Sequence, residues 1–254
     1  MPVLFLGHGN PMNAIEQNAY SQAWQHIAAG LPRPRVILSV SAHWYVPGAR
    51  VTASRRPQTI HDFGGFPREL YRVEYPALGS PELAERVCAL LAPTAVTMDE
   101  GWGLDHGTWS LLVHLYPSAD VPVVQLGIDE TLTPQQHGEL AQRLRSLRDE
   151  GVLILGSGNV VHNLHTYSWG RHPREPYDWG LRFEAHVREM IESGDRSVVE
   201  YERLGEDAEL SVPTPEHFLP LIYVLAQREN GEPVSFPVEG FDGGSVSMLG
   251  MRIG

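Results

Sequence analysis

The chain has 254 residues, 42% hydrophobic and 20% charged, which is the balance of an ordinary folded protein and excludes a disordered one. Its formal net charge of −12 argues against nucleic acid and anionic membranes as partners. A single cysteine excludes an internal disulfide, and the absence of lysine excludes Schiff-base chemistry and lysine-dependent phosphate loops. Acid–base chemistry and metal binding must therefore rely mainly on the twelve histidines.

The chain is expected to form one cytoplasmic domain over residues 1–254. No apolar run approaches the ~20 residues that cross a bilayer, and no basic segment precedes an apolar run as in a signal peptide. The length is sufficient to bury a sizeable core, and no repeat, linker or low-complexity tract divides it.

The first elements in chain order predict a strand–helix–strand unit. Residues 3–6 form a short apolar strand, residues 12–29 have the apolar spacing of a helix, and residues 36–42 form a second apolar strand. The two strands of such a unit should be parallel. His8 follows the first strand and His43 the second, so both are expected at the carboxyl edge of the sheet, where open α/β sheets bind ligands.

The remainder of the chain continues to alternate strands and helices. Further strands are expected at 49–53, 95–98, 121–128 and 152–155, further helices at 81–91, 109–116, 133–149, 178–193 and 218–227, and one or two short strands after 234. The loop at 57–81 is long enough to suggest a functional role. This order predicts a single α/β domain with a central, mostly parallel, twisted sheet flanked by helices and a metal site at the carboxyl edge of the strands.

Four histidines are the main candidates for that metal site. His162 repeats the pattern of His8, in which a buried strand and a glycine break precede a histidine. Three strand ends therefore bring His8, His43 and His162 to one edge. His217 is a fourth candidate, because the positive end of a helix dipole would keep it neutral and able to bind metal. Imidazoles in this number suit Zn, Fe, Cu or Ni, and not Mg or Ca.

The other histidines are weaker candidates. His106 and His61 lie in glycine-rich loops and could contact substrate or support the site, or simply bond to the backbone. The rest lie on ordinary amphipathic helices or in polar loops, and need no function: His26, His114, His137, His165, His172 and His186. Ser157 lies in a Gly-Ser-Gly turn, but this turn is one residue short of the G-x-S-x-G motif of hydrolases.

Six ordered motifs together resemble one enzyme family. They are LFLGHGNPM at 4–12, SAHW at 41–44, HDFGGFP at 61–67, DHGTW at 105–109, GNVVHN at 158–163 and PTPEH at 213–217. In these motifs the chain is similar to the 4,5-DOPA extradiol dioxygenases, a branch of the class III, LigB-like extradiol ring-cleaving dioxygenases, and most of all to bacterial members. The resemblance extends from about residue 2 to the C-terminus.

The resemblance implies one metal in a cleft at the sheet edge. His8, His43 and His217 would be its ligands, His162 would be either a fourth ligand or the catalytic acid–base, and His106 would contact the substrate. The wider family completes its ligand set with a glutamate, and here Glu216 lies next to His217. Neighbouring side chains on a helix point about 100° apart, so only one should face the metal. We choose His217 and keep Glu216 as the alternative.

The resemblance also implies the reaction. One divalent metal per chain would act, with Fe²⁺ needed to open a small catechol, DOPA-like in type, with O₂ to a muconic semialdehyde-type product. His162 would move protons as a neutral imidazole. Zn²⁺, expected in the isolated protein, has no redox chemistry and should not activate O₂. Gly7 and Gly9 are expected to leave room beside His8 for a planar substrate.

Two other functions stay open on the sequence. The same histidines could activate water in a zinc-dependent hydrolase, or the fold could be a non-catalytic metal-binding scaffold. The presence of both His106 and His162 beside the expected ligands favours an enzyme, because a scaffold needs neither. The sequence selects neither the arginine that would bind a substrate carboxylate nor an oligomeric state.

Overall fold

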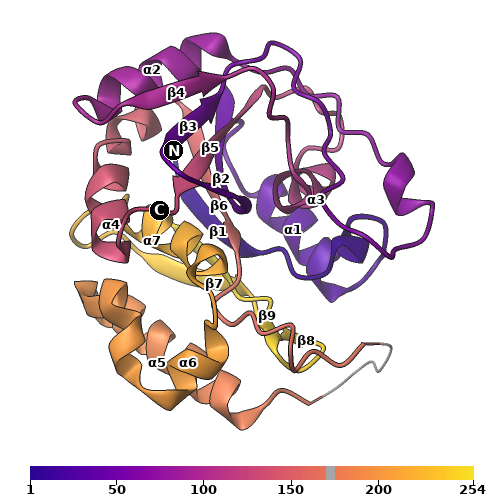
Figure 1. The fold of residues 1–254 in the computed structure, drawn as a ribbon, viewed down its shortest axis with the longest axis vertical. Helices are drawn as coiled ribbons and strands as arrows, with labels where there is room; N and C mark the ends of the chain where they lie inside the picture. The colour runs from indigo at the N-terminus through magenta and orange to yellow at the C-terminus, as the bar shows by residue number, and fades with distance from the viewer. Residues whose placement is uncertain (170–174) are drawn as a thin grey trace.

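The computed structural model describes residues 1–169 and 175–254, and its centre is an eight-stranded mixed sheet (Figure 1). The strands follow the spatial order β4-β3-β5-β2-β6-β1-β10-β7. Their bounds are β1 Val3–Gly7, β2 Val36–Val46, β3 Ala49–Thr52, β4 Val96–Asp99, β5 Val123–Asp129, β6 Val152–Gly158, β7 Val234–Val238 and β10 Gly250–Ile253. A small hairpin joins β8 Phe241–Asp242 to β9 Val246–Ser247.

The centre of the sheet is parallel, and its margins are mixed. β6 pairs in parallel with both β1 and β2, and β2 pairs in parallel with β5. β10 is antiparallel to β1 and to β7, and β3 is antiparallel to β5 but parallel to β4. β1 and β2 are therefore parallel, as predicted, but β6 lies between them. The C-terminal region forms four strands where one or two were expected.

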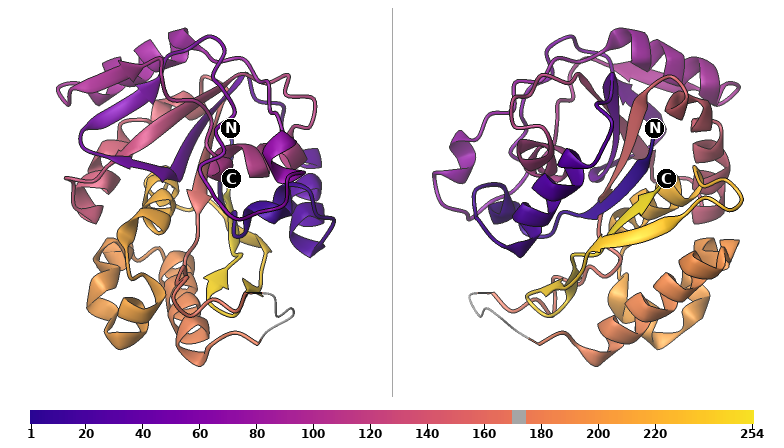
Figure 2. Two further views of the ribbon diagram at one scale, coloured as in Figure 1. Left: turned by 45° about the vertical axis from the view of Figure 1, so that its right-hand side comes forward. Right: turned by 180° about the vertical axis from the view of Figure 1, so that it is seen from behind.

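Helices cover both faces of the sheet, as two views show (Figure 2). They are α1 Ala19–Ala29, α2 Pro81–Leu91, α3 His106–Leu115, α4 Pro134–Gln142, α5 Asp178–Ser193, α6 Glu206–Ser211 and α7 Leu219–Leu225. Shorter 3₁₀ turns are η1 Pro11–Ala14, η2 Leu70–Arg72, η3 Arg145–Arg148, η4 Arg196–Leu204 and η5 Pro215–His217. Within the described residues, no helix is both long enough and apolar enough to span a membrane.

The sheet separates two hydrophobic cores. Val3 and Phe5 of β1 belong to the core beneath α2, α4, α5 and α7, while Leu4 and Leu6 belong to the core beneath α1 and α3. Alternate strand residues point to opposite faces, so a strand covered on both sides must be apolar at every position. This explains the continuous apolar runs in the sequence and confirms the α/β fold with a mostly parallel sheet flanked by helices.

Two predicted helices are interrupted. The helix expected at 12–29 is replaced by η1 and then α1, because the Asn18 side chain accepts from the backbone N–H groups of Tyr20 and Ser21 and begins a new helix there. The helix expected at 133–149 begins with the predicted capping box of Thr133 and Gln136, but its α-helical part ends at Gln142. The short helix α6 was not predicted.

Two candidate histidines lie in regular elements instead of beyond them. His43 was expected after its strand, but β2 continues to Val46, with a break in its β5 register between Val40 and Tyr45. His106 was expected in a loop before a helix starting at residue 109, yet it is the first residue of α3. Asp105 begins this helix early, because its carboxylate accepts from the Thr108 N–H at 3.1 Å.

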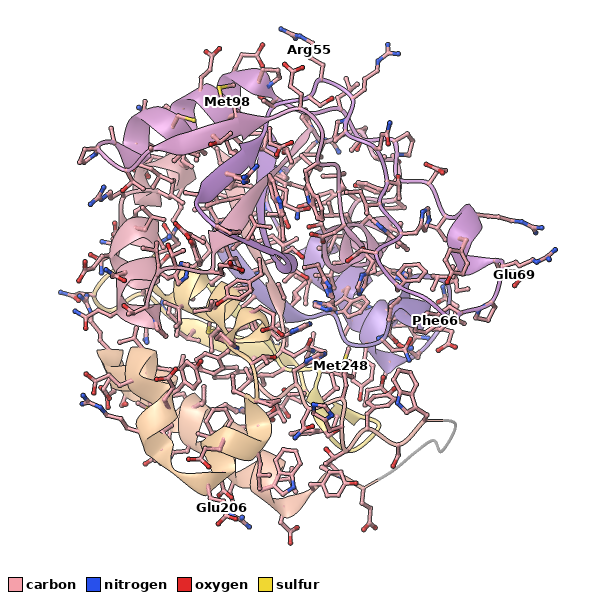
Figure 3. The ribbon with its side chains drawn as sticks, in the orientation of Figure 1. Arg55, Phe66, Glu69, Met98, Glu206 and Met248 are labelled. Carbon is pink, nitrogen blue, oxygen red and sulfur yellow. The ribbon has the colours of Figure 1, made fainter. Side chains whose placement is uncertain are left out.

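The long loop between β3 and α2 is fixed at its base. Ile60 donates to the Leu104 carbonyl at 2.7 Å, and Leu104 donates to the Gln58 carbonyl at 2.8 Å. The indole N–H of Trp109 also donates to the Ile60 carbonyl at 2.8 Å. From this base the loop projects outward, as the position of Phe66 shows (Figure 3). The loop therefore has an anchored part beside α3 and an outer part in solvent.

Candidate metal centre and active site

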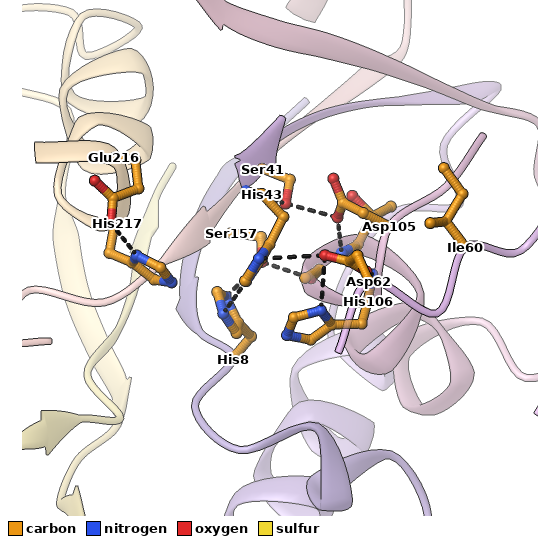
Figure 4. Close-up of polar contacts among 12 residues, drawn as sticks. His8, Ser41, His43, Ile60, Asp62, Asp105, His106, Ser157, Glu216 and His217 are labelled. Carbon is orange, nitrogen blue, oxygen red and sulfur yellow. Dashed lines mark hydrogen bonds and ion pairs between the residues drawn. The ribbon is translucent and has the colours of Figure 1, made fainter. Parts of the chain in front are cut away.

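Four histidine rings from four elements meet at the carboxyl end of the central strands. His8 follows β1, His43 lies in β2, His106 begins α3 and His217 ends η5. The ring centre of His8 lies 5.0 Å from that of His43, 5.4 Å from that of His217 and 5.6 Å from that of His106. In Figure 4 the His217 ring lies on one side of His8 and His43, and the His106 ring lies on the other. The predicted convergence of strand-end histidines is therefore found for His8 and His43.

Three of these rings direct nitrogen atoms to a common point. His8, His43 and His217 each offer one ring nitrogen, and the three lie within 4.8 Å of one another. The Nε2 atoms of His8 and His43 are 3.0 Å apart. The Nε2 atom of His217 is buried and has no hydrogen-bond partner. A buried polar atom without a partner is costly, which indicates a site shaped for an additional group.

The protonated nitrogen of His8 follows from its neighbours. Ser157 Oγ donates to the Gly107 carbonyl at 2.5 Å, so its single proton is used there. His8 Nδ1 lies 3.0 Å from the same oxygen and must therefore donate to it. This assignment leaves a lone pair on His8 Nε2. It also argues against Ser157 as a hydrolase nucleophile, because its proton is directed away from the imidazole.

Carboxylates contact the Nδ1 atoms of the other two rings. Glu216 Oε1 accepts from His217 Nδ1 at 3.1 Å and from Thr214 Oγ1 at 2.7 Å. Asp62 Oδ2 lies 3.3 Å from His43 Nδ1. Burial alone would raise the pKa of Glu216, but its bond to His217, with the charge of that ring, and its bond to Thr214 lower the pKa to about 2. Glu216 is thus an ionised acceptor behind His217.

This donor set fits a metal cation. The Nε2 lone pair of His8 lies 3.0 Å from His43 Nε2, and when the charge of Asp62 holds the His43 proton on Nδ1, two lone pairs face each other and favour a cation between them. Burial, and then the neighbouring histidines, lower the pKa of His8 and His43 well below the usual value, so a proton is a poor substitute near neutral pH. Three neutral imidazoles suit Fe, Zn, Cu or Ni.

His162 lies beside this group and not within it. Its ring stacks on that of His217, with ring centres 3.5 Å apart and an angle of 8° between the planes. Its nitrogen groups with Glu216 and His217, whereas His8 and His43 belong to the other cluster. Burial, followed by the charge of His217, lowers the pKa of His162 well below its usual value. The arrangement offers a neutral imidazole close to the three converging nitrogens.

His106 is held from behind by Asp62. Asp62 Oδ1 accepts from the His106 backbone N–H at 2.9 Å, and Oδ2 lies 3.0 Å from His106 Nδ1. That second contact has the distance of an ion pair but not the alignment of a good hydrogen bond. Burial would raise the pKa of Asp62, but its bonds to His106 and the charge of that ring keep the pKa below its usual value.

Aromatic side chains of the projecting loop cover the His106 side of the cluster. The Phe63 ring meets His106 edge to face, with centres 5.4 Å apart and planes at 84°. Phe66 and Tyr71 pack on Phe63 at 5.4 and 5.1 Å. His61, by contrast, bonds through Nε2 to the Val73 carbonyl at 3.0 Å, which is the backbone role considered for it from the sequence.

The two glycines around His8 make room for the C-terminal segment. A Cβ on Gly7 would lie 2.8 Å from the Ser247 carbonyl oxygen, and one on Gly9 would overlap the Met248 sulfur. Gly9 also has a positive φ of 58°. Met248, labelled in Figure 3, is fully buried. The expectation that these glycines provide clearance for substrate is therefore wrong, because Met248 and its neighbours occupy that space.

A buried polar layer supports the cluster from below. Asp105 accepts from Ser41 Oγ at 2.7 Å and contacts the Gln125 side-chain amide. Burial raises the pKa of Asp105 to about 6. A Cβ on Gly107 would lie 2.8 Å from Cδ2 of His43, so α3 packs directly on β2. Sequence analysis missed Asp105 and Ser41, although both are polar residues within two positions of a candidate histidine.

Of the remaining histidines, those that the structure describes occupy the ordinary positions expected of them. His114 Nε2 bonds to the Asn13 carbonyl at 2.8 Å, and His137 Nδ1 bonds to the Tyr223 hydroxyl at 2.9 Å. His26 is exposed on α1. His172 lies outside the described residues.

Comparison with known proteins gives the family. The family model described as the catalytic LigB subunit of aromatic ring-opening dioxygenase matches residues 3–234. The chain belongs to the LigB family. Ring-opening dioxygenases of this family are oxidoreductases, and this LigB protein is accordingly an enzyme of the extradiol ring-opening dioxygenase type. The resemblance drawn from the six motifs is confirmed.

Relatives of this LigB protein cover nearly its whole length. A 4,5-DOPA dioxygenase extradiol of Escherichia coli is 50% identical over 259 residues, which span 100% of this chain and 95% of that protein. The Beta vulgaris protein of the same name is 36% identical, over 96% of this chain and 92% of its own. A crystal structure of an uncharacterized protein from E. coli K12 has a TM-score of 0.88 and 46% identity, with 100% of both chains covered.

Proposed function

We propose that this LigB protein is a metal-dependent extradiol dioxygenase that opens a catechol of DOPA-like type with O₂ to a muconic semialdehyde-type product. The observation that carries this proposal is the convergence of Nε2 atoms from His8, His43 and His217, two of them 3.0 Å apart and the third buried without a partner. The names of the relatives support the substrate class.

One divalent metal per chain would be held by these three histidines. When bound, Fe²⁺ supplies open coordination positions for substrate and O₂ together with the redox chemistry that ring opening needs. The same imidazoles also suit Zn²⁺, which we expect in the isolated protein and which lacks redox chemistry. Of the two roles left open for His162, its stacking on His217 supports the acid–base over a fourth ligand. Glu216 accepts a hydrogen bond from His217 Nδ1, and we do not propose it as a metal ligand.

His162 and His106 would act on the substrate. His162, held neutral by burial, takes a proton from a catechol hydroxyl at a ring nitrogen and later returns it to the opening product. His106 contacts the substrate from the opposite side of the cluster. The Phe63 ring, at 5.4 Å from His106, gives this side an aromatic wall suited to a planar ring.

The catalytic unit is proposed to be the whole chain, residues 1–254. The family match ends at 234, but β10 pairs with β1 and Met248 packs against Gly9 beside His8, which supports including the C-terminal strands in the catalytic unit. Family membership and the presence of both His106 and His162 favour this function over a zinc-dependent hydrolase or a metal-binding scaffold. A cytoplasmic location stays a prediction from the sequence.

The test is to load metal-free protein anaerobically with Fe²⁺ or Zn²⁺ and to measure oxygen uptake with a panel of catechols. We expect uptake and a yellow product with Fe²⁺, and neither with Zn²⁺. Absence of both with Fe²⁺ on every catechol would overturn the dioxygenase proposal. Hydrolysis of an ester panel by the Zn²⁺ form alone would favour the hydrolase instead.

A further inference from the structure

One carboxylate lies between two histidines of the site. Asp62 Oδ2 is 3.3 Å from His43 Nδ1 and 3.0 Å from His106 Nδ1, while Oδ1 accepts from the His106 backbone N–H at 2.9 Å. The His43 and His106 ring centres are only 3.9 Å apart. The same oxygen therefore contacts the Nδ1 atoms of an expected metal ligand and of an expected substrate contact (Figure 4).

The position of Asp62 is set by the anchored base of its loop. Ile60, two positions before Asp62, donates its N–H to the Leu104 carbonyl and accepts from the Trp109 indole N–H at its own carbonyl. Gly103 has no space for a Cβ, because the Gln58 carbonyl oxygen would overlap it. The Asp62 side chain is only 18% exposed. Close contact between the loop and the start of α3 thus holds this carboxylate on the histidines.

An ionised carboxylate only accepts hydrogen bonds, so its contacts decide where the ring protons lie. The negative charge of Asp62 favours a proton on each Nδ1 atom that faces it, and an Nδ1–H tautomer leaves a lone pair on His43 Nε2 and on His106 Nε2. His43 Nε2 is the atom that lies 3.0 Å from His8 Nε2. Carboxylates behind metal-bound histidines commonly fix the ring tautomer and orientation in this way.

We propose that Asp62 is a positioning residue that fixes the tautomers of His43 and His106 together, so that one presents a lone pair to the metal and the other a lone pair to the substrate. This inference rests on the proposed metal centre. It couples the two functions in a single side chain, so a change at Asp62 affects both metal affinity and turnover. Neither His43 nor His106 needs to be altered for this effect.

Asp62→Asn is the deciding variant. An amide oxygen can still accept from the His106 backbone N–H and hold α3, but the carboxylate charge and one acceptor oxygen are lost. Long-range ¹H–¹⁵N NMR of the Zn²⁺-loaded protein, in which the metal faces His43 Nε2, should show His106 as the Nδ1–H tautomer in the wild type and a shift of His106 towards Nε2–H in Asp62→Asn. Zn²⁺ affinity, from chelator competition, should fall about 10- to 100-fold.

Asp99→Asn is the matched control. Asp99 Oδ1 also accepts from two loop N–H groups, those of Gly101 and Trp102, both at 2.8 Å, but it belongs to β4 at the edge of the sheet. This variant should keep the ring tautomers and should bind Zn²⁺ within about twofold of wild type. With Fe²⁺ at saturation, Asp62→Asn should still show a lower kcat than Asp99→Asn, because His106 is also affected.

The outcomes separate this inference from the proposed function. If wild type binds Zn²⁺ and Asp62→Asn matches it in tautomers and affinity, the role of Asp62 is wrong and the metal centre stands. If wild type binds no Zn²⁺, the metal centre is wrong, and the role of Asp62 there falls with it. Should Asp62→Asn not fold, the wild-type spectrum still decides, because an Nε2–H tautomer of His106 overturns the proposal.

Discussion

At the scale of single residues, hydrogen-bond partners decide which ring nitrogen is available. Ser157 and Glu216 take up the Nδ1 atoms of His8 and His217 at 3.0 and 3.1 Å. The Nε2 atoms are then left to converge, and burial lowers the pKa of both rings so that they stay neutral at physiological pH. The metal-binding chemistry proposed here depends on these residues behind the rings as much as on the histidines.

Loss of a ligand should differ in kind from loss of a substrate contact. His8→Ala and His43→Ala should abolish metal retention after dialysis, measured as metal per chain, because each removes one of the three converging nitrogens. His106→Ala should keep the metal but reduce turnover by about 100-fold or more. His26→Ala, at an exposed position of α1, is the control for removing a histidine. Metal loss in His106→Ala would contradict the role given to His106.

The crowding around Gly9 predicts a cost in stability. Gly9→Ala places a side chain at a φ of 58° and against the Met248 sulfur, so we expect the free energy of unfolding to fall by about 2 kcal/mol. Urea titration would measure it. In a Met248→Ala background the same change should cost less, because the steric conflict is gone. Equal costs in both backgrounds would show that backbone strain alone is responsible.

At the scale of elements, β6 is the strand that brings the site together. It lies between β1 and β2, and its Ser157 is paired with Leu6 on one side and Ser41 on the other. His8, just after β1, and His43, within β2, therefore lie on either side of β6 and approach each other across its carboxyl end. α3, which packs in one core, and η5, which leads into Phe218 of the other core, then add His106 and His217.

The N-terminal cap of α4 is a local interaction, so its loss should lower stability without changing metal binding at the site. Thr133 accepts from the Gln136 N–H at 3.3 Å, and Gln136 accepts in return from the Thr133 N–H at 2.8 Å. Thr133→Ala should lower the free energy of unfolding by about 1 kcal/mol, measured by urea titration, with metal binding unchanged. Thr133→Ser keeps the oxygen and should be near wild type. An equal loss in both variants would show that the cap does not stabilise α4.

At the scale of the whole molecule, the C-terminal strands close the structure around its beginning. β10 pairs with β1, and Met248 packs against the loop that carries His8. Glu184 of α5 is buried beneath this segment and accepts from the Ser247 hydroxyl. Burial raises the pKa of Glu184 to about 7, from an ordinary value of 4.5. The last strands are therefore linked to a carboxyl group that is protonated in the folded state at mildly acidic pH.

This carboxyl group predicts a pH dependence of stability. Between pH 4.5 and about 7 the folded state binds more protons at Glu184 than the unfolded state, so stability from this group is fully present below pH 4.5 and lost as the pH rises through 7. Glu184→Gln, which cannot ionise, should gain stability relative to wild type as pH rises, by up to about 3 kcal/mol at pH 8.

Urea titrations from pH 5 to 8 would test this dependence. Glu192→Gln, at an exposed position of the same helix, corrects for the loss of one negative charge from α5. A constant difference between Glu184→Gln and wild type across this range would mean that Glu184 does not titrate as described.

Much of the fold was predictable because its determinants are local. The helices 81–91 and 178–193 match α2 and α5 end to end, since Ser80 and Pro81 begin one and Gly194, with a φ of 76°, ends the other. The central strands were predictable too, because each is a local run of apolar residues. The break before Asn18 escaped prediction, because an apolar helical spacing continues through it and only the side-chain contacts of Asn18 interrupt it.

The sequence by itself determined the α/β class, the family and the histidines proposed for the site. The strand–glycine–histidine patterns and the short motifs that identify them consist of residues close together in the chain. Tertiary structure alone decided which ring nitrogens converge, that Glu216 lies behind His217, and that Asp62 contacts two rings. It also showed that Gly9 makes room for Met248. These facts depend on contacts between residues far apart in the chain, and such contacts form only when the sheet brings its strand ends together.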